Sequence, residues 1–144
     1  MTTSVAPSAN ALDPEQPGLR IPVDHEAFAP AQTELVGEGD LDGAQLADTR
    51  ACAGCHASIF EQQQRSTHAI SSFNNPIYRA AIDEFRDAVG QPQSQMCAGC
   101  HDVSLLIDGA MRSNVAPTDD RAHAGITCRV CHGIEDATLD GNGS

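Results

Sequence analysis

Residues 52–69 read CAGCHASIFEQQQRSTHA, and the first five of them form the motif Cys-x-x-Cys-His. The same motif returns twice, as CAGCH at residues 97–101 and as CRVCH at residues 128–132. All six cysteines of the chain belong to these motifs, so no odd thiol is left over. Any account of the fold and chemistry of the chain has to explain these three motifs.

Three kinds of site use pairs of cysteines at this spacing. A structural zinc site takes four thiolates from two pairs. Here 41 and 27 residues separate successive cysteine pairs, which is longer than the usual zinc-ribbon spacing, and zinc gives no reason for a histidine after each pair. A thiol–disulfide redox role needs only one pair. The third kind is covalent attachment of c-type haem, for which Cys-x-x-Cys-His is the signature.

The haem alternative accounts for every residue of the motif. Two thiols two residues apart can form thioethers with the two vinyl groups of one porphyrin, and the adjacent histidine supplies the proximal nitrogen to the iron. We therefore predict three covalently attached haem c groups. The thioether residues are Cys52, Cys55, Cys97, Cys100, Cys128 and Cys131, and the proximal ligands are His56, His101 and His132.

Three histidines lie outside the motifs: His25, His68 and His123. Three irons need three distal ligands, so the counts favour two histidines on every iron. His68 follows His56 by twelve residues, which is about 18 Å along a continuous helix, so we expect it to serve a neighbouring haem. His123 lies five residues before the third motif and can cross to an adjacent haem. A solvated surface histidine is the alternative for each, and it is strongest for His25, which stands between acidic residues near the N-terminus.

Other side chains are secondary candidates near the haems. Met96 and Met111 are the fallback distal ligands, although methionine more often fills gaps in a core. Arg65, Arg121 and Arg129 lie beside candidate ligands or motifs and could bind haem propionates in a bidentate manner. The alternative, to which we give equal weight, is that these three residues are ordinary surface arginines.

The composition favours bound prosthetic groups. The chain has 144 residues, no tryptophan, one tyrosine and four phenylalanines. So few large apolar side chains would struggle to offset the conformational entropy of the chain by themselves. We therefore expect a small domain that is mostly α with extensive coil, and whose core is the packed haems.

The charge balance narrows the class of partner. Twenty acidic residues against eight basic ones give a formal net charge of −12. This balance argues against nucleic-acid binding and against adhesion to an anionic membrane. It suits simple solubility, a saline milieu, or docking to a basic face of a partner. We predict no membrane span, since no stretch approaches the roughly 20 apolar residues that one needs.

The chain divides into three parts. Residues 1–49 are rich in proline, alanine, glycine and acids, and predict an extended N-terminal arm that wraps the domain. Residues 50–134 form the triheme domain, and residues 135–144 form a C-terminal tail.

Local signals predict helices and no convincing strand. Residues 57–72 are good helix formers and should continue from the first motif as a helix. Residues 74–76 (NNP) read as a turn and cap before a helix at residues 77–89, and Gly90 is a natural stop. A short helix is expected within residues 103–112. The apolar face expected for the helix at residues 77–89 consists of Ile77, Ala81, Phe85 and Ala88.

Two segments beside the motifs carry a family resemblance. They are residues 66–69 (STHA) and residues 125–133 (GITCRVCHG). They resemble the nitrification-type tetrahaem cytochrome family and, equally, the wider group of multihaem cytochromes related to hydroxylamine oxidoreductase. In that group a Ser-x-His segment and a histidine just before the later motif supply distal ligands, so the resemblance implies these roles for His68 and His123. It covers about residues 50–133, with three motifs where the family has four.

The leading hypothesis is an electron carrier. We predict a triheme c-type cytochrome with bis-histidine haems, which relays electrons between redox protein partners or within a larger multihaem assembly. One alternative is a small haem reductase with an open iron site, if His25 is not a ligand. Another is a subunit of a haem-bearing filament, a homo-oligomer in which the arm donates His25 to the next copy.

The expected location is the periplasm or the cell exterior. Resemblance to other c-type cytochromes implies that haem is attached outside the cytoplasm. The first ten residues, MTTSVAPSAN, lack the basic start and apolar run of a secretory leader. We therefore expect that a leader has been removed or that the chain is part of something longer.

Overall fold

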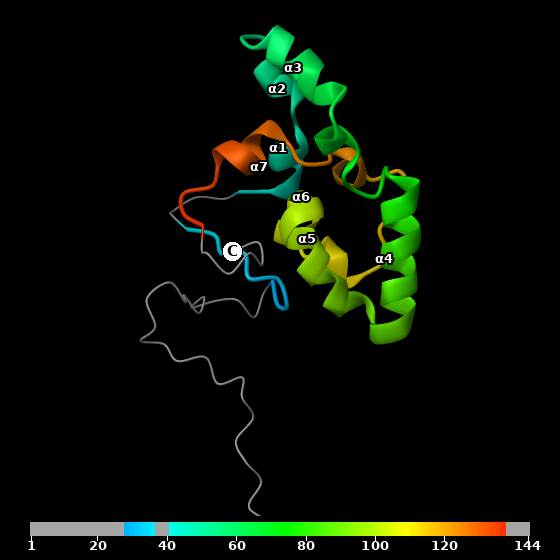
Figure 1. Cartoon of the computed structure of the whole chain (residues 1–144). Coiled ribbons are helices and arrows are strands. Elements are labelled where there is room, and N and C mark those ends of the chain that lie inside the picture. The colour runs from blue at the N-terminus through cyan, green and yellow to red at the C-terminus, as the bar shows by residue number, and fades with distance from the viewer. Residues whose placement is uncertain (1–27, 37–40, 138–144) are drawn as a thin grey trace, which may run out of the picture.

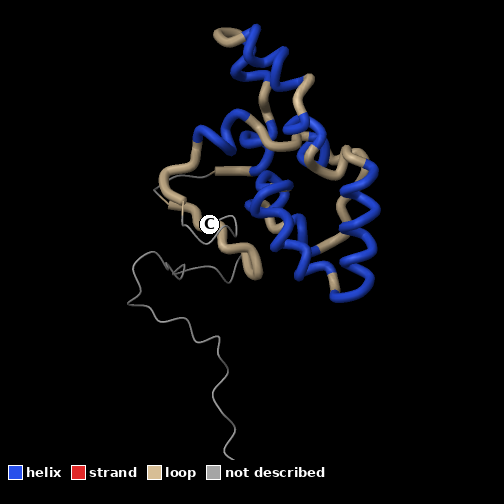
Figure 2. Tube along the Cα trace, viewed as in Figure 1, coloured by secondary structure: helices blue, strands red, loops and turns tan. Residues whose placement is uncertain are grey.

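The computed structural model describes residues 28–36 and 41–137 of the chain. Within these ranges the protein consists of helices and loops without any strand (Figure 2). The α-helices are α1 (Gly43–Ala47), α2 (Arg50–Ala53), α3 (Ala57–Gln64), α4 (Pro76–Val89), α5 (Gln95–His101), α6 (Val103–Ile107) and α7 (Cys128–His132). The 3-10 helices are η2 (Thr67–Ile70), η3 (Gln91–Ser94), η4 (Ala110–Arg112) and η5 (Asp120–His123). The expected class, a small domain that is mostly α, is confirmed.

The longest helix, α4, begins and ends where the sequence predicts. The side chain of Asn75 caps it by accepting hydrogen bonds from the main-chain nitrogens of Ile77 and Tyr78. Pro76 occupies the first helical position, where its missing N–H costs nothing. Gly90 ends the helix with a φ of 96°, a conformation that favours glycine.

The buried face of α4 differs from the expected one. Ile77 is 80% exposed and Ala81 is exposed, whereas Ile82 and Arg86 are buried. A charged residue can occupy this face because the guanidinium of Arg86 donates a hydrogen bond from Nε to Oγ of Ser94, 2.9 Å away. The prediction of an apolar stripe through Ile77 and Ala81 was therefore wrong.

The helix expected over residues 57–72 is interrupted. Helix α3 ends at Gln64, and Ser66 adopts an extended conformation (φ −87°, ψ 164°) before η2 begins. The hydroxyl of Ser66 donates to the carbonyl oxygen of Gln63 at 2.7 Å, which satisfies a main-chain acceptor at the end of the helix. His68 consequently lies on η2 and not on a continuous helix from the first motif.

The short helix expected within residues 103–112 is present in two pieces. Helix α6 is followed by Gly109, whose φ of 67° lies in the left-handed region, and η4 starts after it. A glycine at this position turns the chain without the steric cost that a side chain would bring.

Helix α1 lies within the stretch that was assigned to the N-terminal arm, and it packs on α6. Its Gly43 donates a main-chain hydrogen bond to Asp108 at 2.8 Å, and Leu46 is buried. A Cβ at Gly43 would lie 1.9 Å from the carbonyl oxygen of Ser104, so only glycine allows this approach. The division into arm, domain and tail stays a prediction. His25 lies outside the described residues.

The described part of the chain has a side-chain core around α5 and α6, which lie at the centre of Figure 1 with α4 beside them. Helices α2 and α3, which carry the first motif, project from this centre (Figure 1). The buried cluster consists of Ala31, Phe73, Ile82, Ala98, Leu105, Leu106, Met111, Val115 and Ala122. That packed haems complete this core stays a prediction.

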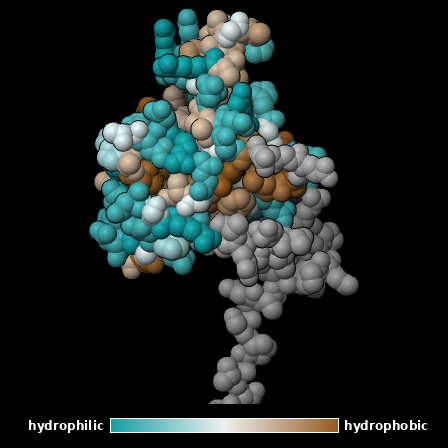
Figure 3. Space-filling view, turned by 180° about the vertical axis from the view of Figure 1, so that it is seen from behind, coloured by the Kyte–Doolittle hydropathy of each residue, from teal (hydrophilic) through white to brown (hydrophobic). Residues whose placement is uncertain are grey.

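The surface seen from behind is largely hydrophilic, with hydrophobic residues gathered near its middle (Figure 3). Among the described residues, no helix combines the length and apolar character that crossing a bilayer would need.

Candidate haem sites

The three motifs each lie in or beside a short helix. Cys52 is in α2 and His56 caps α3, the second motif forms the end of α5, and the third motif is the whole of α7. None of the six thiols forms a disulfide, and the second cysteine of each motif is exposed. Thiols in this state are open to thioether formation, so the chemistry of these donors fits haem c.

The first and third motifs lie side by side. The pKa of the Cys128 thiol is raised by burial and, next, by the neighbouring thiol of Cys52. A second link joins the flanking residues, because Thr127 donates from Oγ1 to the carbonyl oxygen of Leu46 at 2.7 Å. Motifs that are 76 positions apart, counted from Cys52 to Cys128, therefore form one region of the surface.

His68 is fixed next to the residues that lead into the third motif. Its carbonyl oxygen accepts a hydrogen bond from the main-chain nitrogen of Ile126 at 2.8 Å. Gly125, with a φ of 64°, allows this contact, because a Cβ there would lie 2.1 Å from the same oxygen. The imidazole of His68 is exposed.

His123 lies at the end of η5, close to the segment that carries His68. The side-chain amide of Asn74 joins the two segments, since it donates to the carbonyl oxygens of Ala69 at 2.7 Å and of His123 at 3.3 Å. Nε2 of His123 lies 2.7 Å from the carbonyl oxygen of Pro117. A carbonyl oxygen only accepts, so in this arrangement Nε2 carries the hydrogen and the lone pair is on Nδ1.

The imidazole of His101 in the second motif is held by a hydrogen bond at Nδ1, the ring nitrogen that is not expected to bind iron. Its Nδ1 lies 2.6 Å from the carbonyl oxygen of Ser71 and donates to it, which leaves the lone pair of Nε2 free for iron. The hydroxyl of Ser71 accepts from the main-chain nitrogen of Ile126 at 3.0 Å. Ser71 therefore contacts both the second motif and the residues before the third. The sequence carries no signal for this role, because one of the two contacts uses a main-chain atom.

The zinc alternative receives no support from the described residues. Within residues 28–36 and 41–137, no three histidine, cysteine or acidic side chains gather as a metal cluster would require. Two of the three spare histidines, His68 and His123, lie within this part, and the structure brings their segments together. His25 lies outside it.

Three of the secondary candidates have other partners. Arg129 donates from Nη1 to the carbonyl oxygen of Gln45 at 2.5 Å. Arg121 forms ion pairs with Asp108 at 2.5 Å and Asp119 at 2.6 Å. Met111 is fully buried in the side-chain core, and its sulfur lies 3.6 Å from Nη2 of Arg86. Met111 therefore belongs to the core in this structure.

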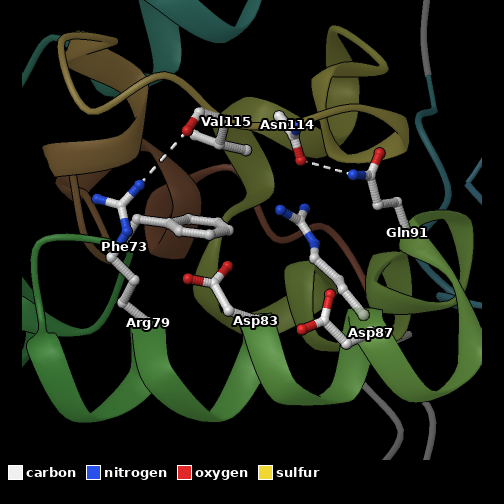
Figure 4. Close-up of a pocket in the computed structure, with 8 residues that line it drawn as sticks. Phe73, Arg79, Asp83, Asp87, Gln91, Asn114 and Val115 are labelled. Carbon is white, nitrogen blue, oxygen red and sulfur yellow. Dashed lines mark hydrogen bonds between the residues drawn. The ribbon is translucent and has the colours of Figure 1, made fainter.

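A polar pocket of about 340 Å³ opens beside α4 (Figure 4). The ring of Phe73 lies near two guanidinium groups, with its centroid 5.6 Å from Cζ of Arg79 and 5.0 Å from Cζ of Arg86. Burial lowers the pKa of Arg86. No cysteine or histidine lines the pocket, so it is not one of the predicted ligand sites. Its lining residues are Phe73, Arg79, Asp83, Arg86, Asp87, Gln91, Asn114 and Val115.

A small helical domain with Cys-x-x-Cys-His motifs at its helix ends is typical of c-type cytochromes. Residues 51–133, more than half of the chain, match the family described as cytochrome c554 and c-prime, and the chain belongs to this family. Membership implies covalently bound haem c and a role in electron transfer. No curated protein matches the chain, and no solved structure matches it.

Proposed function

We propose that the chain is a triheme c-type cytochrome that relays electrons, with two histidines on each iron. The observation that carries the proposal is the presence of three complete Cys-x-x-Cys-His motifs together with three further histidines. Haem c supplies an iron that accepts and gives one electron at a time. Membership in the cytochrome c554 and c-prime family supports the electron-transfer role.

The residues of the chain have distinct roles in this proposal. The six cysteines attach the haems, and His56, His101 and His132 occupy the proximal positions. His68, His123 and His25 occupy the distal ones. Two imidazoles per iron leave no open position for a small molecule, and they favour a lower reduction potential than a histidine–methionine pair does.

The proposed setting is the periplasm or the cell exterior, where proteins of this class typically act. The net charge of −12 suits a partner with a basic docking face, or a neighbouring module of a multihaem assembly. Complementary charge of this kind mainly raises the rate of encounter.

The test is to count haems and their spin states. The mass of the purified protein should exceed that of the chain by three haem groups, and a pyridine haemochrome assay should give the same number. Electron paramagnetic resonance (EPR) of the oxidised protein should show only low-spin haem. A full equivalent of high-spin ferric haem that binds cyanide or nitric oxide would contradict complete bis-histidine ligation, and would favour the reductase alternative.

The N-terminal histidine needs its own measurement. His25→Ala should convert one haem to the high-spin form without changing the haem count. In the wild-type protein the low-spin signals should not change on dilution, and light scattering should give a monomer. Loss of one low-spin signal on dilution would instead mean that His25 is donated to another copy, as in the filament alternative.

A further inference from the structure

The ring of Tyr78 stacks on the imidazole of His101. The ring centroids are 4.6 Å apart and the planes differ by 23°. Tyr78 comes from the first turn of α4, and His101 is the last residue of α5. On another side Phe73, which is 2% exposed, packs edge-on against Tyr78 with a centroid distance of 5.7 Å. Tyr78 is therefore held between a buried aromatic ring and a predicted iron ligand.

The hydroxyl end of Tyr78 is fixed as well. It donates to Oδ2 of Asp102 at 2.5 Å, while the hydroxyl of Ser72 donates to Oδ1 of the same carboxylate. Asp102 is 2% exposed and directly follows His101 in the chain. Burial raises the pKa of Tyr78 above its ordinary value, with Asp102 adding to the effect, so the hydroxyl keeps its hydrogen and stays a donor.

The contacts on His101 restrain rotation of its imidazole about the Cα–Cβ bond and about the Cβ–Cγ bond. The hydrogen bond from Nδ1 to the carbonyl oxygen of Ser71, 2.6 Å long, fixes one edge of the ring and its tautomer. The stacked ring of Tyr78 covers a face and opposes rotation about the Cβ–Cγ bond. A hydrogen bond and a stack together define the plane of the imidazole, which neither contact would do by itself.

We propose that Tyr78 is a positioning residue that sets the orientation of the His101 imidazole plane on the iron of the second motif. This inference rests on the proposed bis-histidine function. In a low-spin ferric haem with two imidazoles, the largest g value rises as the two ligand planes turn from parallel towards perpendicular. Partners of a metal-bound histidine also tune the metal. A change at Tyr78 should therefore alter the spectrum of one haem only.

The test compares variants of the full haem-loaded chain. Tyr78→Leu removes the ring face, whereas Tyr78→Phe keeps the stack and removes only the hydroxyl. Ile82→Ala is the matched control, because Ile82 is buried on the same helix one turn further along and is not part of the stack. Each variant is examined by low-temperature EPR of the oxidised state, by potentiometric titration, and by thermal unfolding.

The expected result is specific to one haem. In Tyr78→Leu, the largest g value of one low-spin signal and one midpoint potential should shift, while the other signals stay as in the wild type. Tyr78→Phe should keep the wild-type g values. Ile82→Ala should lower the melting temperature and leave every g value unchanged. If Tyr78→Leu yields no haem-loaded protein, Tyr78→Met supplies a longer and more flexible side chain without a ring face and answers the same question.

Three results would overturn the proposal. The first is a Tyr78→Leu or Tyr78→Met protein with a lower melting temperature and unchanged g values and potentials, which would mean that the tyrosine only packs. The second is a Tyr78→Phe protein that shifts as much as Tyr78→Leu, which would assign the effect to the hydroxyl. The third is a g shift in Ile82→Ala as large as that in Tyr78→Leu. Failure of the proposed function is distinguishable, because it would appear in the wild-type protein as high-spin haem before any variant is made.

Discussion

The main-chain nitrogen of Ile126 donates a hydrogen bond to the carbonyl oxygen of His68 at 2.8 Å. This contact joins the η2 segment to the residues immediately before the third motif, 58 positions further along the chain. A predicted distal ligand and a haem-attachment motif are thus coupled through the backbone, and changes at the junction should affect both stability and ligation.

Gly125→Ala should be strongly destabilising. The new Cβ would meet the carbonyl oxygen of His68 at 2.1 Å and would also sit at a φ of 64°, so steric overlap adds to backbone strain. We expect a loss of about 3 kcal/mol or more in the free energy of unfolding, measured by urea titration. Gly109→Ala is the matched control, because its φ is 67° but no atom outside Gly109 and its two chain neighbours lies within 4 Å of the new Cβ. It should cost about 1 kcal/mol, and equal losses in the two variants would contradict the proposed overlap.

His68→Ala should open one iron to exogenous ligands. If His68 is a distal ligand, its removal leaves one haem five-coordinate and high-spin, and added imidazole should restore the low-spin spectrum. Thr67→Ala changes the exposed neighbour on the same 3-10 helix and should leave the spectrum unchanged. A wild-type spectrum in His68→Ala would remove this residue from the ligand set.

Arg86→Ala should destabilise the fold more than Arg79→Ala does. The guanidinium of Arg86 is buried, lies 5.0 Å from the Phe73 ring centroid, and donates to Ser94 and to the carbonyl oxygen of Met111. Losing these contacts and leaving their partners unpaired should cost about 3 kcal/mol. Arg79 is less buried and makes a hydrogen bond of 3.4 Å to Val115, so we expect about 1 kcal/mol or less. Chemical denaturation midpoints measure both, and equal losses would contradict the role of burial.

Stability should fall in acid partly through Asp119. Hydrogen bonds from Arg121 lower the pKa of this carboxyl group below its ordinary value. The ionised Asp119 side chain therefore makes its full contribution to the free energy of unfolding above the unfolded-state pKa of about 4. This contribution is lost as the pH falls through the lower folded-state pKa. Since solvent screens the pair, we expect about 1 kcal/mol or less.

Asp119→Asn is the variant that isolates this effect. Asparagine can still cap η5, where the Asp119 side chain accepts from the main-chain nitrogen of Arg121. The urea midpoint of the variant should be lower than that of the wild type near neutral pH. The difference should shrink as the pH falls below the unfolded-state pKa of about 4, and it should disappear once the carboxyl group is protonated in the folded protein as well. A difference that persists unchanged in acid would mean that the charge of Asp119 is not involved.

The bounds of α4 could be predicted from the sequence because the residues that start and stop this helix act on neighbouring residues of the chain. The cap at Asn75, the proline after it and the stop at Gly90 each act within one turn of α4. Helix α1 was missed although it has a local signal: Asp42 accepts from the main-chain nitrogen of Gln45, three residues later. The proline- and acid-rich surroundings hid that signal.

Other features could not be predicted because they depend on distant partners. The buried positions of Arg86 and Asp102 contradict what their charges favour, and each is stabilised by a residue elsewhere in the chain. The end of α3 depends on the Ser66 hydroxyl, which helix propensity does not register. The cysteines and their adjacent histidines need only the spacing of the motif, so the sequence predicted them from residues alone.

The junction between the ends of the described domain has a consequence for biogenesis. The flanks of the first motif find their partners in residues 126–129: Leu46 contacts Thr127, Gln45 contacts Arg129, and Gln63 donates to Ile126. A growing polypeptide that is exported from its N-terminus presents the first motif before these partners have emerged. For an exported chain we therefore expect haem to be attached at the first motif before the domain closes around it.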